Sequence, residues 1–145
     1  MPLPDPHPGL VLSYSYLWAD EYRAGGEDGR KDRPCAIVLT RQVVGNHTLV
    51  TVVPITHSPP ANAAESIEIP PKIKAHLGLD HLPSWIIISE VNDFIWPRPD
   101  LRHIPSSGQL RFDYGVLPPG FFRQVRDRLL ALVAARRVAN VPRSE

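Results

Sequence analysis

Hydrophobic and polar positions alternate near the start of the chain, and the pattern changes period near its end. From Leu12 to Trp18 every second residue is a large apolar or aromatic one. This period of two is typical of a strand with one buried face, and we expect the strand to begin at Leu10. The glycines and charges of the following segment, Ala19 to Asp32, predict a loop.

Two apolar runs rich in β-branched residues come next, Cys35 to Thr40 and Thr48 to Ile55. The sequence between them, Val44-Gly45-Asn46-His47, contains a turn signal of the kind that joins antiparallel strands. The two runs and the turn therefore predict a β-hairpin.

The register of this hairpin decides which side chains share a face. If the turn is centred between Gly45 and Asn46, Cys35 lies opposite Thr56. Arg33 then lies two residues further out on the same side of the sheet. A guanidinium and a hydroxyl would share one face, although a slip of one residue would separate them.

The middle of the chain predicts three short elements and one irregular stretch. Ser66 to Ile69 indicates a strand, and Pro71 to Leu77 indicates one or two helical turns that end at Gly78. The apolar run within Ser84 to Val91 predicts a central strand. Closely spaced prolines in Trp96 to Pro99 exclude a regular ladder there.

Apolar residues recur at helical spacing after Pro118. The stripe consists of Phe121, Val125, Leu129, Leu132 and Val133. We expect this helix to end near Val138 and residues 139–145 to fray. Several short strands and one amphipathic helix predict a mainly β fold, a small bent barrel in one domain over residues 9–138 after a proline-rich tail at 1–8.

Composition narrows the possible classes of protein. A chain of 145 residues can bury a core without disulfides, and its single cysteine, Cys35, is expected to be a buried thiol. The segment Met1 to Gly9 lacks the pattern of a signal peptide, and no apolar run is long enough to span a membrane. We therefore expect a cytoplasmic protein. A net charge of +1 does not indicate a general nucleic-acid coat.

In order and spacing, these motifs resemble the PemK/MazF family of toxins from toxin–antitoxin systems. The likeness covers roughly Gly9 to Arg137. It is carried by Tyr14-Ser15-Tyr16-Leu17-Trp18, the charged loop, Arg33-Pro34, Val53-Pro54-Ile55-Thr56, Ser89-Glu90-Val91-Asn92 and Gly115-Val116-Leu117 before the last helix. The resemblance implies an SH3-like barrel, a homodimer, an antitoxin partner, and cleavage of single-stranded RNA without a metal or other cofactor.

Arg33 and Thr56 are the catalytic residues that the resemblance implies. Cleavage of RNA by its own 2′-hydroxyl needs charge stabilisation at phosphorus, a task that suits the forked, permanently charged guanidinium of Arg33. Thr56 would form a hydrogen bond with the scissile phosphate or with the nucleophile. The simpler alternatives are an arginine at a strand end and a threonine in ordinary turn chemistry.

Two further residues are weaker catalytic candidates. Free imidazole changes charge near neutral pH, which makes a histidine such as His57 a plausible proton carrier, but in an extended strand His57 would point away from Thr56. Glu90 lies where some family members carry an acidic general base. The arginine that those members have two residues earlier is Ile88 here, so the assignment of acid and base stays open. A strand end in contact with solvent explains Glu90 equally simply.

Aromatic, basic and amide side chains supply candidates for RNA binding. They are Tyr16, Trp18, Arg30, Lys31 and Asn92. Aromatic faces stack on bases, and cations attract the phosphates. Alternatively, the aromatic residues belong to the core or to a dimer contact, and the cations belong to a solvated loop. The remaining histidines are too dispersed in the sequence to indicate a metal site.

Two other functions compete with the ribonuclease. A toxin on the same fold that poisons gyrase would act by protein binding, but such toxins resemble one another at an aromatic C-terminus that this chain lacks. A non-catalytic binding module would have kept the fold and lost the nuclease, for which Ile88 is the best argument.

Overall fold

A long hairpin forms the centre of the sheet. The structure is a computed structural model that describes residues 5–25, 32–43, 45, 47–96, 104 and 112–142. Strands β2 (Arg33–Val43) and β3 (His47–Thr56) pair antiparallel along most of their length, which confirms the predicted hairpin. Gly45 adopts a φ of 85° at the turn, a left-handed conformation that glycine reaches without a steric cost.

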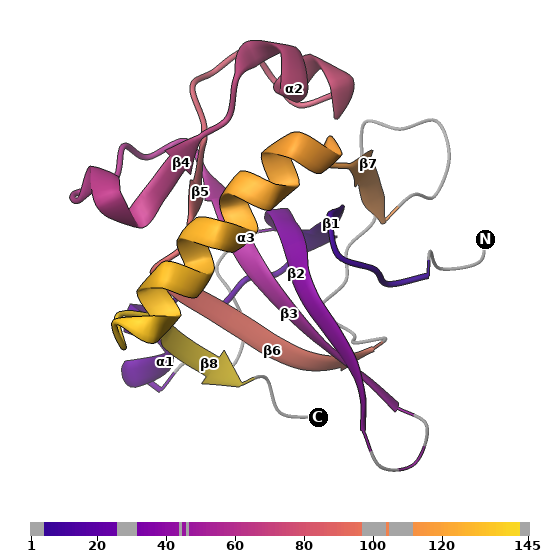
Figure 1. Ribbon diagram of the computed structural model, residues 1–145, viewed down its shortest axis with the longest axis vertical. Helices are drawn as coiled ribbons and strands as arrows, with labels where there is room; N and C mark the ends of the chain where they lie inside the picture. Colours follow the sequence, from indigo (N-terminus) through magenta and orange to yellow (C-terminus); the bar gives the residue numbers. More distant parts are fainter. Residues whose placement is uncertain are drawn as a thin grey trace.

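In the part of the chain that the structure describes, six further strands extend this hairpin on both sides. They are β1 (Leu10–Tyr14), β4 (Ser66–Glu68), β5 (Trp85–Ile87), β6 (Glu90–Trp96), β7 (Asp113–Val116) and β8 (Ala139–Pro142). The spatial order is β4-β5-β3-β2-β1-β7, and β6 joins β3 to β8. Figure 1 shows β2 and β3 at the centre of this arrangement.

The outer edge of β3 is shared by two partners. Thr48–Val52 pairs with β6, and Ile55–Thr56 pairs with β5. Pro54, which has no N–H to donate to a ladder, lies in the gap between the two pairings. The predicted strand from Ser84 to Val91 is therefore wrong as one element, because the chain leaves one half of β3 and pairs with the other half.

The sheet is open. Among the described residues, no pairing joins the edge strand β4 to the edge strand β7. The prediction of a mainly β fold is confirmed, whereas the prediction of a closed barrel is not. Short strands and an amphipathic helix are compatible with either arrangement, because closure depends on pairing between distant edges.

Helices lie outside the sheet, and two of the four found in the described ranges begin at proline. They are α1 (Ala19–Arg23), the 3₁₀ turn η1 (Ala63–Glu65), α2 (Pro71–His76) and α3 (Pro119–Ala134). The fixed φ of proline suits the first turn, as the sequence of α2 and α3 predicts. Helix α1 was not expected, since its segment was predicted to be part of a loop.

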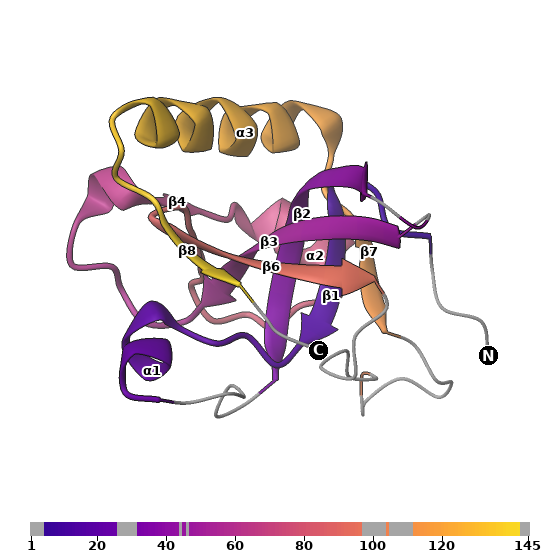
Figure 2. The ribbon, with the colours of Figure 1, turned by 90° about the horizontal axis from the view of Figure 1, so that it is seen from below.

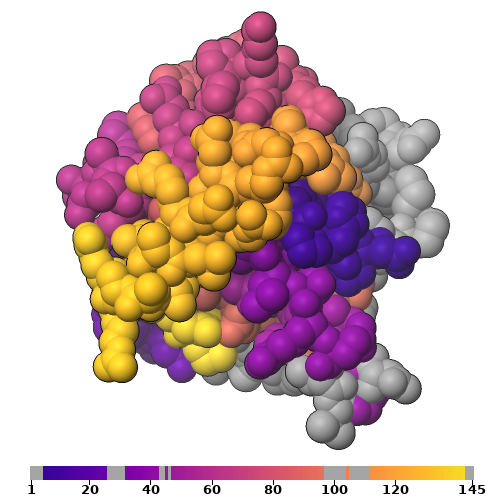
Figure 3. Space-filling view, in the orientation of Figure 1, coloured from indigo at the N-terminus to yellow at the C-terminus, as the bar shows by residue number. Residues whose placement is uncertain are grey.

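Neighbouring strand residues enter cores on opposite faces of the sheet, because side chains alternate along a strand. Val11 and Ala36 belong to the core beneath α3, whereas Leu12 and Ile37 belong to the core on the other face. Helix α3 lies across the first face (Figures 2 and 3). Its predicted apolar stripe is buried except for Val133, which is 52% exposed.

The C-terminal segment is a strand, which corrects the prediction that residues from 139 onward fray. After α3 the chain reverses at Arg136, whose φ of 58° is left-handed. β8 then pairs parallel to β6. Val141 is buried with Leu17 and Ala19, and this contact between the two ends of the domain holds the strand in place.

Candidate functional site

The register brings the outer ends of β2 and β3 together. Cys35 pairs with Pro54, so the predicted pairing of Cys35 with Thr56 is wrong by two residues. The shift has two causes of one residue each. The turn is centred on Gly45 and not between Gly45 and Asn46, and a bulge in β2 between Ile37 and Leu39 adds an unpaired residue. Continued outward, the register sets Arg33 opposite Thr56. An even shift keeps side chains on the same face.

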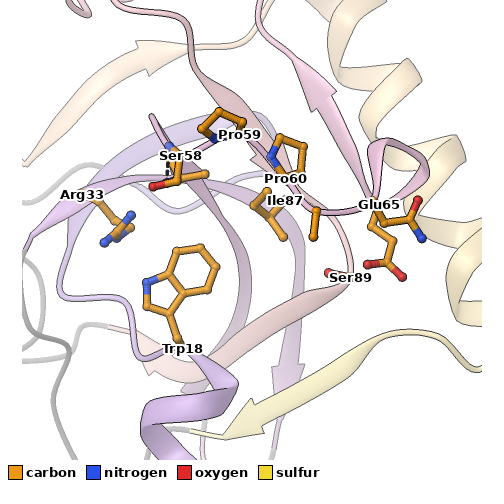
Figure 4. Close-up of a pocket in the computed structure, with 11 residues that line it drawn as sticks. Trp18, Arg33, Ser58, Pro59, Pro60, Glu65, Ile87 and Ser89 are labelled. Carbon is orange, nitrogen blue, oxygen red and sulfur yellow. Dashed lines mark hydrogen bonds between the residues drawn. The ribbon is translucent and has the colours of Figure 1, made fainter.

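Arg33 and Thr56 both line two adjoining hollows at this end of the sheet. The first hollow has a volume of about 330 Å³ and extends past Trp18 to Glu65. In Figure 4, Trp18 and Arg33 lie together at one end of this hollow and Glu65 lies at the other. The second hollow has a volume of about 380 Å³ and is lined by His57 as well. Arg33 and Thr56 thus lie on the boundary between the two spaces.

The guanidinium of Arg33 is held by an aromatic face. Its central carbon lies 4.9 Å from the centroid of the Trp18 ring, a distance at which the ring attracts a cation. The Nε atom is buried and has no hydrogen-bond partner among the described residues. Stacking orients the guanidinium fork without neutralising it, so its N–H groups can donate to an anion in either hollow.

The hydroxyl of Thr56 has a fixed orientation. Its Oγ1 accepts a hydrogen bond of 3.1 Å from the backbone N–H of Ser58, where the chain turns away from β3. The hydroxyl proton therefore remains for donation to a ligand. Arg33 and Thr56 together offer donors of the kind that a phosphate group accepts.

His57 reaches the same region by a turn of the backbone. β3 ends at Thr56, and the chain bends at the next two residues, so His57 does not follow the alternation of an extended strand. His57 Nε2 lies 2.8 Å from Oδ2 of Asp80. Both residues line the second hollow together with Arg33 and Thr56.

Glu90 lies apart from these residues. Within the described part of the chain it lines neither hollow. Its Oε1 accepts hydrogen bonds from the Ala19 N–H at 2.9 Å and the Tyr16 hydroxyl at 3.2 Å. Burial raises the pKa of the Glu90 carboxyl above its usual range, while these two hydrogen bonds oppose the rise. Glu90 therefore anchors the start of α1, and this geometry does not support a catalytic role.

Two of the residues predicted to bind RNA are buried. Tyr16 is 1% exposed in the core, where its ring packs edge-on against Trp18. Asn92 is fully buried, and its amide makes two hydrogen bonds with the backbone of Leu17, at 3.0 and 2.8 Å. The burial of both side chains argues against the prediction that they contact RNA.

Trp18 is the one described residue of that set whose position suits a ligand. It is half-buried and lines the first hollow beneath Arg33. Arg30 and Lys31, the basic candidates, lie outside the described residues. The geometry of this site therefore depends on Trp18, Arg33 and Thr56.

The structure also adds residues that the sequence did not suggest. Ser58, Asn62 and Ser89 bring polar groups to the first hollow, and Asp80 and Tyr114 line the second. The Val-Pro-Ile-Thr motif ends two residues before Ser58, so the residues that follow the motif could have been included in the prediction. Asp80 and Tyr114 carry no local signal, since only the tertiary fold brings them to His57.

Within the described ranges, no group of three or more His, Cys, Asp and Glu side chains is arranged to hold a metal ion. In the same ranges no helix has the length and apolarity that crossing a bilayer requires.

An open β-sheet with a helix across one face, and an arginine–threonine pair between two hollows, defines a candidate site for binding a phosphate-containing ligand. The family model of the PemK-like, MazF-like toxins of type II toxin–antitoxin systems matches residues 16–94, a segment that includes Trp18, Arg33 and Thr56. The chain belongs to this toxin family. No curated protein and no solved structure is similar enough to the chain to count as a match.

Proposed function

We propose that this toxin is an endoribonuclease that cleaves single-stranded RNA, including mRNA, without a metal ion. The 2′-hydroxyl of the substrate attacks the adjacent phosphorus, and the bond to the 5′-oxygen breaks. The products carry a 2′,3′-cyclic phosphate, or the 3′-phosphate formed from it by hydrolysis, and a 5′-hydroxyl. The observation that carries this proposal is the placement of Arg33 and Thr56 on the boundary of the two hollows.

Arg33 stabilises the transition state in this proposal. Negative charge grows on the non-bridging oxygens as the phosphorus becomes five-coordinate, and a guanidinium donates to two oxygens at once. Trp18 holds the guanidinium by its ring face, leaving the N–H groups for the phosphate. Thr56 donates its hydroxyl proton to a phosphate oxygen, since its lone pair already accepts from Ser58.

The two hollows accommodate the nucleotides on either side of the scissile phosphate. A strand that places its phosphate at Arg33 and Thr56 extends one neighbouring nucleotide into the first hollow and the other into the second. Phosphate contacts of this kind are independent of sequence, whereas base recognition depends on the polar residues around each hollow.

Two protein partners belong to this proposal. An antitoxin would block cleavage by occupying the hollows. A second copy of the toxin would bind at a groove of about 630 Å³ between α3 and the β2–β3 hairpin. This groove contains exposed Leu39, Leu130 and Val133, and its rim carries both Arg126 and Asp93. Contact with water is unfavourable for such an apolar patch. Because the rim carries both a positive and a negative side chain, two copies related by a two-fold axis can pair opposite charges.

The test is cleavage of a labelled single-stranded RNA by the antitoxin-free protein in excess EDTA, with mapping of the ends. Removal of one transition-state donor costs about 10²–10³-fold in rate, so we expect a loss of this size for Arg33→Ala. Arg33→Lys should restore only part of the rate, because an ammonium lacks the fork.

Arg123→Ala is the matched control, since Arg123 is exposed on α3 and lines neither hollow. Intact RNA with the wild-type protein would refute the nuclease. Inhibition of DNA supercoiling in that case would identify a gyrase poison, and inactivity in both assays would leave a binding module. Unfolding of Arg33→Ala by circular dichroism would show that Arg33 is structural.

A further inference from the structure

A buried lysine organises the loop beside the second hollow. Lys74 is 4% exposed, and its ammonium donates to Oδ1 of Asp80 at 2.9 Å, to Oγ of Ser84 at 2.7 Å and to the carbonyl of Leu82. Three acceptors match the three N–H donors of an ammonium group, so this buried cation is fully satisfied. The segment from Asp80 to Ser84 is thereby fixed relative to α2.

Asp80 is oriented by this arrangement. Its Oδ1 accepts from Lys74 and from the backbone N–H of Leu82, at 3.1 Å. The hydrogen bond from Lys74 is the main cause that lowers the pKa of the Asp80 carboxyl below its usual range. Asp80 is consequently a carboxylate at neutral pH, with a fixed direction.

Both oxygens of this carboxylate lie within hydrogen-bond distance of a histidine ring. Nε2 of His57 lies 2.8 Å from Oδ2 and 3.1 Å from Oδ1 of Asp80. Because Nε2 is committed to Asp80, Nδ1 is the ring nitrogen left for a substrate. The His57 side chain is 50% exposed, and it lines the second hollow with Arg33 and Thr56.

We infer that His57 is the general acid of this site and that Asp80, anchored by Lys74, is its positioning residue. This inference rests on the proposed ribonuclease function. In the step, the 2′-oxygen loses its proton to solvent and forms a bond to phosphorus, while the bond from phosphorus to the 5′-oxygen breaks. The imidazolium of His57 gives its Nδ1 proton to the leaving 5′-oxygen and becomes neutral. Asp80 stays ionised and accepts the Nε2–H hydrogen bond throughout.

The charges around the second hollow suit this assignment. Besides His57, the described ionisable residues that line this hollow are Asp32, Arg33, Asp80 and Tyr114. Lys74 lies behind the lining and pairs with Asp80. Arg33 is directed at the phosphate, and Lys74 is satisfied by its own acceptors. The carboxylate in direct contact with the ring is therefore the group that stabilises the imidazolium before it transfers its proton.

The test uses two RNA oligonucleotides in single-turnover cleavage at saturating protein concentration. One has the ordinary phosphodiester, and in the other a sulfur replaces the 5′-oxygen at the cleaved bond. A thiolate leaves without being protonated, so the second substrate does not need a general acid. The variants are His57→Gln and Asp80→Asn, with His81→Gln as the matched control, because His81 is exposed next to Asp80 and does not line the second hollow.

With the ordinary substrate, we expect His57→Gln to be about 10²–10⁴-fold slower than the wild type, and Asp80→Asn to be slower by a smaller factor. With the sulfur substrate, both variants should approach the wild-type rate, whereas Arg33→Ala should stay slow.

Two results would overturn the assignment. One is cleavage of ordinary RNA by His57→Gln at the wild-type rate. The other is an equal defect on both substrates, which would assign His57 to binding or folding. If the wild-type protein cleaves neither substrate, the proposed function fails and the general acid fails with it. Wild-type cleavage without dependence on His57 would refute this inference alone.

Discussion

The buried side chain of Asn92 holds the backbone of Leu17, the residue before Trp18, by two hydrogen bonds. Its amide oxygen accepts from the N–H of Leu17 at 3.0 Å, and its amide nitrogen donates to the carbonyl of Leu17 at 2.8 Å. Asn92 is fully buried and Leu17 is 1% exposed, so water does not compete for these groups. The next residue is Trp18, whose ring supports Arg33. Substitution of Asn92 by alanine removes both hydrogen bonds and leaves both backbone groups buried.

The size of the effect follows from those two groups. A buried donor or acceptor that loses its partner costs about 1–3 kcal/mol. For the N–H and the carbonyl of Leu17 together, we expect Asn92→Ala to lower the free energy of unfolding by about 2–6 kcal/mol. Domains are typically stable by about 5–15 kcal/mol, so this single change removes a large part of the total.

Urea denaturation followed by far-UV circular dichroism measures this loss, and Asn140→Ala is the control. Asn140 also uses its amide, donating to Asp93 at 2.6 Å, but it is exposed, so its loss should cost less than about 1 kcal/mol. A change below about 0.5 kcal/mol for Asn92→Ala, combined with a loss of RNA affinity, would show that the amide is a ligand contact and that its hydrogen bonds to Leu17 are unimportant.

Two further predictions concern other parts of the molecule. Burial raises the pKa of the Glu90 carboxyl in the folded chain. At a pH below the usual pKa range of a glutamate, the carboxyl is protonated in the folded and the unfolded chain alike. As pH rises just above that range, the unfolded chain loses its proton first and the free energy of unfolding falls. When the free energy of unfolding is measured against pH, Glu90→Gln should lack this decrease. Equal slopes in the wild type and the variant would contradict the raised pKa of Glu90. Leu130 is 57% exposed in the groove beside α3. If the toxin is the dimer proposed above, Leu130→Asp should lower its mass in light scattering to that of a monomer. A dimer mass that does not change would place the interface elsewhere.

The amino-acid sequence alone was sufficient for several local elements of this protein, although it missed helix α1 and the division between β5 and β6. The β2–β3 hairpin, the strand near Ser66, the helical turns closed by Gly78 and the long helix α3 depend on periodicity and on turn chemistry, which neighbouring residues determine. The order of the motifs also indicated the toxin family, and the family model confirms it. The sequence placed Arg33 and Thr56 on one face of the sheet by means of an incorrect register. The register was wrong by two residues, and a shift of two leaves each side chain on the same face.

Contacts between distant segments were decided only by the tertiary structure. The strand β8, the open edges of the sheet and the burial of Tyr16 and Asn92 depend on partners that are far away in the sequence. His57 meets Asp80 and Lys74 for the same reason, because α2 and the loop after it fold back over the end of β3. A side chain's type limits the chemistry that it can perform, whereas its burial and its partners decide whether that chemistry reaches a ligand.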